Sequence, residues 1–360
     1  MTAFIRRAQS RKWRAPVRFA ALALAAGAAL AACSSNSNSS SSASSASGSG
    51  SAAADTSSGS GGSVVPGGPS LAGKTVLLDI YDPESNTFFQ PAVNGAKAAA
   101  AAFGLNLQIE YANGDDPTAI SQIKTAIASK YAGVVAKIPD TGVMNAACAV
   151  KNAGIPVVAF NTITSGGNGC AESFVGQDFV SSGELIAQYM VSQGLIKSGD
   201  SVMCPVESPD QSYAVSRKQG VENVLSKMGI QCNELGTTDD LATAKTDMVQ
   251  YLLGHRNTKA IIALGGTPLA EAQAAASAAG AKVAIGGFDL SFPQIVTGIQ
   301  SGAISGSVNQ EPYAQGFYSI EEIALQLKFG INPMNINTSN NALITKSNVG
   351  SFSPLVPNYQ

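Results

Sequence analysis

From Lys74 onward the chain alternates short apolar runs with longer helix-like stretches, separated by turn residues. The first run, Thr75–Ile80, is typical of a buried strand because β-branched and leucine residues follow one another without alternation. Further strands are predicted at Leu107–Tyr111, Gly133–Ile138, Val157–Phe160 and Phe174–Val175. A predicted helix follows each of them except Val157–Phe160, and this order favours a parallel sheet.

The same order then begins a second time. Strands are predicted at Ser201–Pro205, Ile230–Leu235, Ala260–Leu264, Lys282–Phe288 and Ile304–Val308. Ala153–Asn161 and Ala279–Asp289 correspond between the two halves, since each passes from Ala-Gly into a strand that ends on Phe and then a side-chain oxygen. We therefore expect an α/β fold with two facing lobes.

A polar loop follows the first predicted strand. It begins at Asp82-Pro83, carries Asn86, Phe88 and Phe89, and leads into a helix that opens near Pro91. In open α/β sheets, ligands bind where the parallel strands end, so this loop is a candidate ligand site. The alternative is that one of the two Phe rings belongs to the core under the helix.

The N-terminus is typical of an export signal. Residues 1–32 carry six basic and no acidic residues, followed by an apolar stretch, Phe19–Leu30, that is too short for a permanent membrane span. Leu-Ala-Ala before Cys33 resembles a lipoprotein cleavage site; the alternative is an ordinary secretory signal with a chance cysteine. Residues 33–73, rich in Ser and Gly, are predicted to be a disordered tether.

Charge and composition exclude several classes of function. Removing the six N-terminal basic residues from the chain's 22 leaves 16 basic against 24 acidic residues, a net charge of −8, which argues against nucleic-acid binding. His255 is the only histidine, so the sequence does not supply the several histidine ligands that a histidine metal site needs. No cofactor is expected.

Four cysteines follow Cys33 in a chain predicted to be exported, so disulfides are expected. We favour Cys148–Cys170 and Cys204–Cys232 because a bond between lobes would hinder their movement. The other two pairings, and buried free thiols, remain open. No Cys-x-x-Cys spacing supports a metal site.

Six short motifs occur in the order found in one family. They are Ser85–Gln90, Phe160-Asn161, Gly176–Asp178, Arg217–Gly220, Gly286–Asp289 and Asn309–Glu311. In this order they resemble the ribose-binding-like branch of ABC-transporter substrate-binding proteins, over roughly Thr75–Lys328. The chain departs from that pattern at Lys137, where the family often has Asn, and at Gly265-Gly266, where it has an Asn-Asp-type pair.

The resemblance implies the type I periplasmic binding protein fold, with two Rossmann-like lobes joined by a three-strand hinge and a ligand cleft between them. The lobes would be residues 74–176 plus 311–338, and residues 177–310 plus 339–360. Phe88 and Phe89 would flank a sugar ring. The polar ligand contacts would be Asp82, Asn86, Asn161, Asp178, Arg217, Asp289 and Gln310.

The residue chemistry supports a small neutral sugar or polyol as the ligand. Carboxylates accept hydroxyl hydrogens strongly, flat rings cover apolar sugar faces, and a guanidinium donates in a planar fork. Three alternatives remain for single residues. Asp289 could cap a helix after Ser291, Arg217 could form a surface ion pair, and Asn86 and Gln310 could be turn or capping residues.

An enzyme is not expected, because no phosphate-binding glycine motif and no Gly-x-Ser-x-Gly elbow is present. A repressor of related fold would begin with a helix-turn-helix where this chain has its export signal. The resemblance implies a monomer that delivers its ligand to an ABC permease and its ATPase. It would be lipid-anchored at the extracytoplasmic face of the membrane, in the periplasm or at the cell surface. The alternative function is a receptor for an autoinducer-like furanosyl signal that feeds a sensor or transporter.

Overall fold

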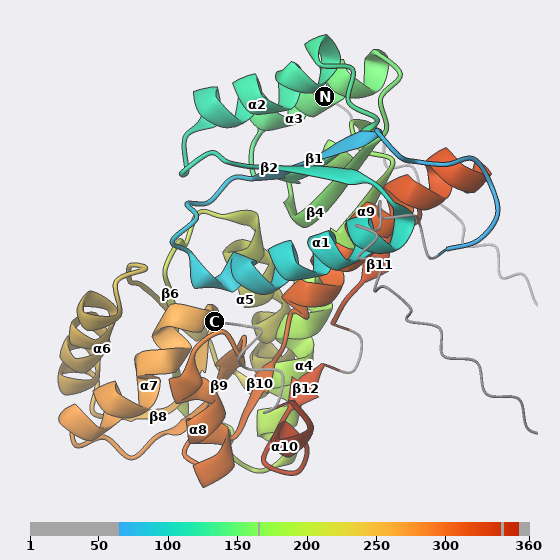
Figure 1. Ribbon diagram of the computed structural model, residues 1–360. Helices are drawn as coiled ribbons and strands as arrows, with labels where there is room; N and C mark the ends of the chain where they lie inside the picture. The colour runs from blue at the N-terminus through green and yellow to red at the C-terminus, as the bar shows by residue number, and fades with distance from the viewer. Residues whose placement is uncertain (1–64, 165, 340–341, 353–360) are drawn as a thin grey trace, which may run out of the picture. The chain divides into compact units, whose positions relative to one another are not determined.

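The computed structural model describes residues 65–164, 166–339 and 342–352. Within them, the first sheet is parallel throughout, with the strand order β11-β5-β4-β3-β1-β2 (Figure 1). The strands are β1 (Thr75–Ile80), β2 (Asn106–Tyr111), β3 (Gly133–Ile138), β4 (Val157–Ile163), β5 (Ser173–Gly176) and β11 (Ile336–Asn337). The predicted bounds of β1 and β3 are confirmed, whereas β4 runs further than predicted.

The second sheet has the strand order β12-β10-β9-β8-β6-β7, and only the short β12 runs antiparallel to its neighbour among the described strands. The strands are β6 (Ser201–Val206), β7 (Cys232–Gly236), β8 (Thr258–Ala263), β9 (Ala284–Phe288), β10 (Gly306–Val308) and β12 (Leu343–Ile344). We call the two sheets with their helices the first and second lobes.

Helices cover both faces of the first sheet. Leu78 of β1 packs under α1 (Gln90–Phe103) and α9 (Pro312–Phe329), whereas Leu77 packs under α2 (Asp116–Ala128) and α3 (Thr141–Asn152). Successive strand side chains point to opposite faces, and in this parallel sheet both faces are buried. This explains the continuous apolar run in the sequence. A 3-10 turn, η1 (Thr87–Phe89), precedes α1.

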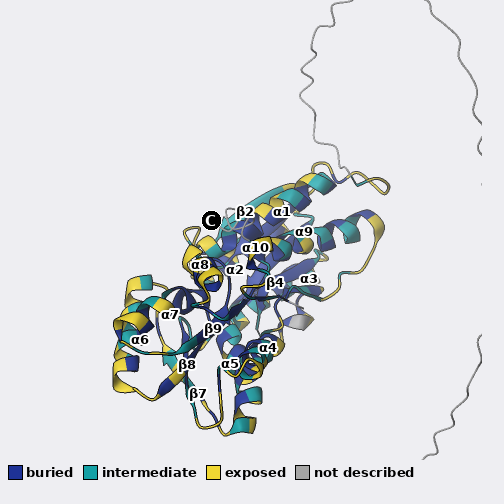
Figure 2. Ribbon diagram, turned by 90° about the horizontal axis from the view of Figure 1, so that it is seen from below, coloured by how far each residue is buried: buried dark blue, intermediate teal, exposed yellow. Residues whose placement is uncertain are grey.

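The second lobe repeats this arrangement. The helices are α4 (Phe179–Ser192) and α5 (Ser212–Leu225) on one face, and α6 (Leu241–Gly254), α7 (Gly266–Ala278) and α8 (Pro293–Ser301) on the other. The short elements are η2 (Gly167–Gly169), η3 (Ser226–Met228) and α10 (Val349–Phe352). Figure 2 shows exposed residues on the outer side of α6 and buried residues along the strands.

The chain passes between the two sheets three times, after β5, after β10 and after β11. The last crossing lies in the tail after α9, where β11 joins the first sheet and β12 the second. After the second crossing, α9 returns to pack against α1 of the first lobe. The alternation of strands and helices and the two-lobed α/β fold are therefore confirmed.

Residues 65–73, which the sequence placed in the tether, lie against the first lobe. Leu71 is 2% exposed, and the Lys328 Nζ donates to the Pro69 carbonyl oxygen at 3.3 Å. Val65 also packs on the core of this lobe. Burial of the apolar side chains of Val65 and Leu71 stabilises this segment against the lobe. The predicted signal peptide, the lipidated Cys33 and the rest of the tether lie outside the described residues.

Both favoured disulfides are present, one in each lobe. Cys148 of α3 bonds to Cys170 just after η2, with Cα atoms 4.3 Å apart. Cys204 of β6 bonds to Cys232 at the start of the neighbouring β7, with Cα atoms 5.7 Å apart. Neither bond joins the two lobes, as predicted.

Candidate functional site

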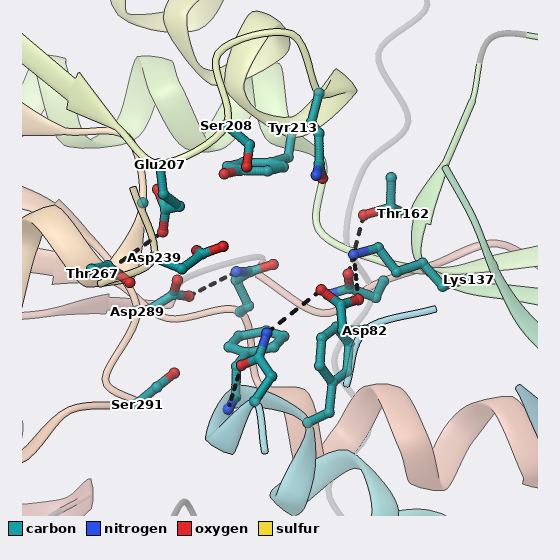
Figure 3. Close-up of a pocket in the computed structure, with 18 of the residues that line it drawn as sticks. Asp82, Lys137, Thr162, Glu207, Ser208, Tyr213, Asp239, Thr267, Asp289 and Ser291 are labelled. Atoms are coloured by element: carbon teal, nitrogen blue, oxygen red, sulfur yellow. Dashed lines mark hydrogen bonds and ion pairs between the residues drawn. The ribbon is translucent and has the colours of Figure 1, made fainter. Parts of the chain in front are cut away.

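A cavity of about 120 Å³ lies between the lobes, where strands of both sheets end (Figure 3). The first lobe lines it with Asp82, Asn86, Phe88, Phe89, Lys137, Asn161 and Thr162. The second lobe and the crossing after β10 line it with Phe179, Glu207, Ser208, Gln211, Tyr213, Arg217, Asp239, Gly265, Gly266, Thr267, Asp289, Ser291, Phe292 and Gln310. The polar groups gather at the carboxyl ends of parallel strands, the edge at which open α/β sheets hold ligands.

The loop after β1 presents its aromatic rings to this cavity. The Asn86 side chain caps η1 by accepting from the Phe88 backbone N–H at 3.1 Å, and it also donates to Asp82. The Phe88 and Phe89 rings meet edge to face, with centroids 5.0 Å apart. Phe89 is buried in the core of the first lobe, and Phe88 packs on that core while lining the cavity. Asn86 is therefore a capping residue, as its alternative interpretation predicted, and it also lines the cavity.

Lys137, noted in the sequence only as a departure, pairs with Asp82. Its Nζ lies 2.7 Å from the Asp82 Oδ2, and the whole residue is 5% exposed. The ammonium also lies 5.3 Å from the centroid of the Phe89 ring, close enough for a cation–π contact. The lysine thus neutralises the carboxylate at the end of β1 and fixes its position.

Asn161 and Asp289 lie at corresponding places in the two lobes, as the duplicated strands predicted. Both adopt positive φ angles, 61° and 77°, and both are 5% exposed. The Asn161 Nδ2 donates to the Oε1 of Gln315 at 3.2 Å, and Gln310 donates to the Asp289 Oδ1 at 2.8 Å. Gln315 also donates to the Gln310 carbonyl oxygen at 2.9 Å. Hydrogen bonds therefore connect the two strand ends through the crossing after β10.

The helix-capping alternative for Asp289 is wrong, because the N-cap position of α8 is Phe292. Instead, the carboxylate lies in the cavity wall, where burial raises its pKa while Arg217 and the hydrogen bond from Gln310 oppose the rise. For Gln310 too, the side chain bonds to a cavity carboxylate and caps no helix.

Arg217 is buried, at 1% exposure, so its surface ion-pair alternative is also wrong. Its Nε and Nη2 donate to the Gln177 Oε1 at 3.0 and 2.8 Å, and its Nη1 donates to the Leu264 carbonyl oxygen at 2.7 Å. The guanidinium lies 4.2 Å from the centroid of the Phe288 ring. Burial lowers its pKa, while Asp289 opposes this.

Gly220 holds the helix of Arg217 close to its neighbour. A Cβ at Gly220 would overlap the carbonyl oxygen of Val180, so only glycine allows α5 to approach α4 this closely. In the Arg-x-x-Gly motif, the glycine therefore allows the two helices to pack, and the arginine supplies the polar group at the cavity.

Asp178 is the one predicted ligand contact that is not among the residues lining the cavity. It is exposed and caps α4, accepting from the Ser181 backbone N–H at 3.0 Å. Its neighbour Gln177 is 1% exposed and holds Arg217 in place. In the stretch Gly176–Asp178, the buried polar side chain is thus the amide and not the acid.

Two further carboxyl groups, which no sequence motif pointed to, line the cavity: Glu207 after β6 and Asp239 after β7. Burial raises the pKa of Glu207 to about 7, with Asp289 and Asp239 adding to the rise and Arg217 opposing it. Burial and the nearby Asp82 also raise the pKa of Asp239, against the effect of Lys137. Their position just after predicted strands, like that of Asp289, is the signal that could have revealed them.

The cavity is suited to a small hydroxylated molecule. Its volume of about 120 Å³ admits several waters or one small molecule. Four carboxyl groups supply acceptors, and Phe88, Phe179 and Phe292 supply flat apolar surface. In the part of the chain that is described, no cluster of acidic, His or Cys side chains could hold a metal ion. No helix there is both long and apolar enough to cross a bilayer.

Comparisons with known proteins agree with this geometry. Residues 80–331 match the family described as periplasmic binding protein domain. The chain is 25% identical to a xylose/arabinose-binding protein of Sulfolobus acidocaldarius over 296 residues, which cover 77% of this chain and 72% of that protein. It is 24% identical to a ribose import binding protein of Bacillus subtilis over 238 residues, 66% of this chain and 76% of that protein.

Solved structures show the same fold. A carbohydrate transporter protein of Acidothermus cellulolyticus, in complex with myo-inositol, has a TM-score of 0.72 and 24% identity, and the match covers 80% of this chain and 99% of that one. A solute-binding protein of Burkholderia graminis, in complex with D-arabinose, has a TM-score of 0.70 and 21% identity, over 78% and 98% of the two chains.

Proposed function

Because the chain belongs to the periplasmic binding protein domain family, a family of binding proteins and not of enzymes, we propose that it binds a small neutral sugar or polyol in the cavity between its lobes. The bound ligand is then delivered to the permease and ATPase of an ABC importer. The protein is a lipoprotein, anchored through Cys33 at the extracytoplasmic face of the membrane.

The observation that carries this proposal is the set of polar groups at the strand ends. Asp82 and Asp289 are each held by a donor, Lys137 at 2.7 Å and Gln310 at 2.8 Å. Fixed carboxylates with further lone pairs suit ligand hydroxyls, and the Phe88 ring beside them suits the apolar face of a sugar or cyclitol. The relatives named for xylose, arabinose and ribose, and the related structure with myo-inositol, support the same ligand class.

The three crossings between the lobes support a hinge that closes on the ligand. Closure would desolvate both walls of the cavity together, so each ligand hydroxyl would need a partner. The proposed ligand contacts all line the cavity: Asp82, Asn86, Phe88, Phe89, Asn161, Arg217, Asp289 and Gln310. Asp178 caps α4 instead.

A ligand panel tests the proposal. The purified full chain is heated with D-ribose, D-xylose, L-arabinose, myo-inositol, an autoinducer-like furanosyl compound and, as a control class, neutral amino acids. We expect a raised melting temperature with at least one sugar or polyol, and the ligand recovered unchanged. A shift with only the furanosyl signal favours the receptor function, and a shift with only amino acids rejects the proposal.

A further inference from the structure

Gly265 is an exception among the strand ends around the cavity. It follows β8 and carries no side chain, whereas the ends of the neighbouring β6 and β9 carry Glu207 and Asp289. The space beside Gly265 is filled by Glu207, since a Cβ at Gly265 would overlap the Glu207 carboxyl group. The departure from the family pattern at this glycine thus makes room for an acidic side chain from the next strand end.

The Glu207 carboxyl group has one oxygen in use and one unpaired. Its Oε1 accepts from the Thr267 backbone N–H at 3.4 Å, at the start of α7, where Gly265 occupies the N-cap position without a capping side chain. Its Oε2 is buried and has no hydrogen-bond partner among the described residues. Asp239 lines the same side of the cavity (Figure 3).

The other two carboxylates of the cavity already have partners. Asp82 is paired with Lys137, and Asp289 accepts from Gln310. No ion pair joins Glu207 or Asp239 to a cation in the portion of the chain that is described. On this side of the cavity, the Oε2 of Glu207 is therefore a buried acceptor without a partner, and Asp239 is an exposed carboxyl group that a ligand hydroxyl can reach.

We propose that Glu207 determines the specificity of the cavity, accepting a hydroxyl hydrogen at Oε2 while Asp239 accepts one from the adjacent hydroxyl. This inference rests on the proposed function and deepens it, because it defines the ligand as a sugar or polyol with a vicinal diol on this side. An ether oxygen there would place two acceptors face to face, and a deoxy carbon would leave the buried oxygen unpaired. Hydrogen bonds from ligand hydroxyls favour the ionised, accepting form of a carboxyl group.

The variant Glu207→Gln separates this role from a structural one. The amide is nearly isosteric, and its carbonyl oxygen must face the Thr267 N–H, which places its NH₂ group in the cavity. A donor then replaces the acceptor at the position of Oε2. Gly265→Ala is an independent second variant, because its new Cβ forces the carboxyl group of Glu207 away.

The test is calorimetry of the full chain with a bound parent ligand from the panel and with each of its monodeoxy and mono-O-methyl analogues. We expect the wild type to lose roughly 5- to 150-fold in affinity for the two analogues, one deoxy and one O-methyl, that are altered at the hydroxyl facing Glu207, since an unpaired buried group costs that much. Glu207→Gln and Gly265→Ala should weaken binding of the parent ligand by a similar factor. For an analogue altered at the hydroxyl facing Glu207, their affinity should equal that of the wild type. Glu172→Gln, on an exposed residue outside the cavity, leaves all affinities unchanged.

Each remaining outcome has a definite meaning. If Glu207→Gln discriminates among the analogues as the wild type does, or loses affinity equally for all of them, the specificity role is refuted while the proposed function stands. If the wild type binds no sugar or polyol, both are refuted.

Discussion

Asp79 lies in the middle of β1, and its carboxyl group is fully buried with no hydrogen-bond partner for either oxygen among the described residues. It shares a face of the strand with Leu77, under α2 and α3, and lies in register with Glu110 of β2. Burial, with a smaller contribution from Glu110, raises its pKa from 3.8 to about 8. The side chain is therefore mostly protonated in the folded protein at neutral pH.

The pH dependence of stability follows from this shift. Below 3.8 the group is protonated in both the folded and unfolded states, and between 3.8 and about 8 only the unfolded state releases the proton. Stability contributed by this group is thus fully present at low pH and is lost as the pH rises toward 8. At about 1.4 kcal/mol per unit, the loss between about pH 5 and about pH 7 is roughly 3 kcal/mol.

Asp79→Asn removes the titration while keeping the shape of the side chain. Its amide also lacks partners, but that cost does not depend on pH. We expect the stability of the variant relative to the wild type to improve by roughly 3 kcal/mol between about pH 5 and about pH 7.

Urea unfolding of the ligand-free protein at both pH values measures this difference, and Glu172→Gln is the control that should show none. If the difference in stability between the variant and the wild type stays constant over this range, the pKa of Asp79 is not raised in the folded protein.

Three further predictions concern other parts of the chain. Replacing Gln315 by Met breaks its bonds to Asn161 and to the crossing after β10, so sugar affinity measured by calorimetry should fall about tenfold or more; unchanged affinity would mean that Asn161 is held without it. The double substitution C204A/C232A opens a 28-residue loop and should cost roughly 3–4 kcal/mol of unfolding free energy in urea, and no loss would contradict this. Mass spectrometry of membrane-extracted protein should find Cys33 acylated at the new N-terminus, and a free thiol there would reject the lipid anchor.

The strands could be predicted from the sequence because both faces of each sheet are buried. Apolar runs such as Thr75–Ile80 therefore marked the strands directly, and polar residues after them marked the cavity edge. The duplicated strand ends predicted that Asn161 and Asp289 face each other, and both residues line the cavity. The apolar run nevertheless concealed Asp79, since one buried acid does not change the pattern of its neighbours.

The features that could not be predicted depend on contacts between segments that are far apart in the sequence. Whether Gln177 or Asp178 turns inward depends on where Arg217 of α5 lies, which the local sequence does not show. The role of Gly265 becomes clear only when Glu207, far away in the chain, is seen to fill its space. Strands as short as β11 form because two neighbouring segments meet, so the tail gave no periodic signal of its own.

Calorimetric titration of the full chain and of Asp289→Ala with the same panel ligand tests whether the cavity between the lobes binds a sugar or polyol. Asp289 is held by Gln310 in the cavity wall and contributes nothing to a helix cap or a disulfide. We predict saturable binding of a sugar or polyol to the wild type, and about ten- to a thousandfold weaker binding to a variant that still folds. Equal affinity of the two proteins would mean that the ligand binds elsewhere, and no binding of any sugar or polyol to the wild type would reject the proposed function.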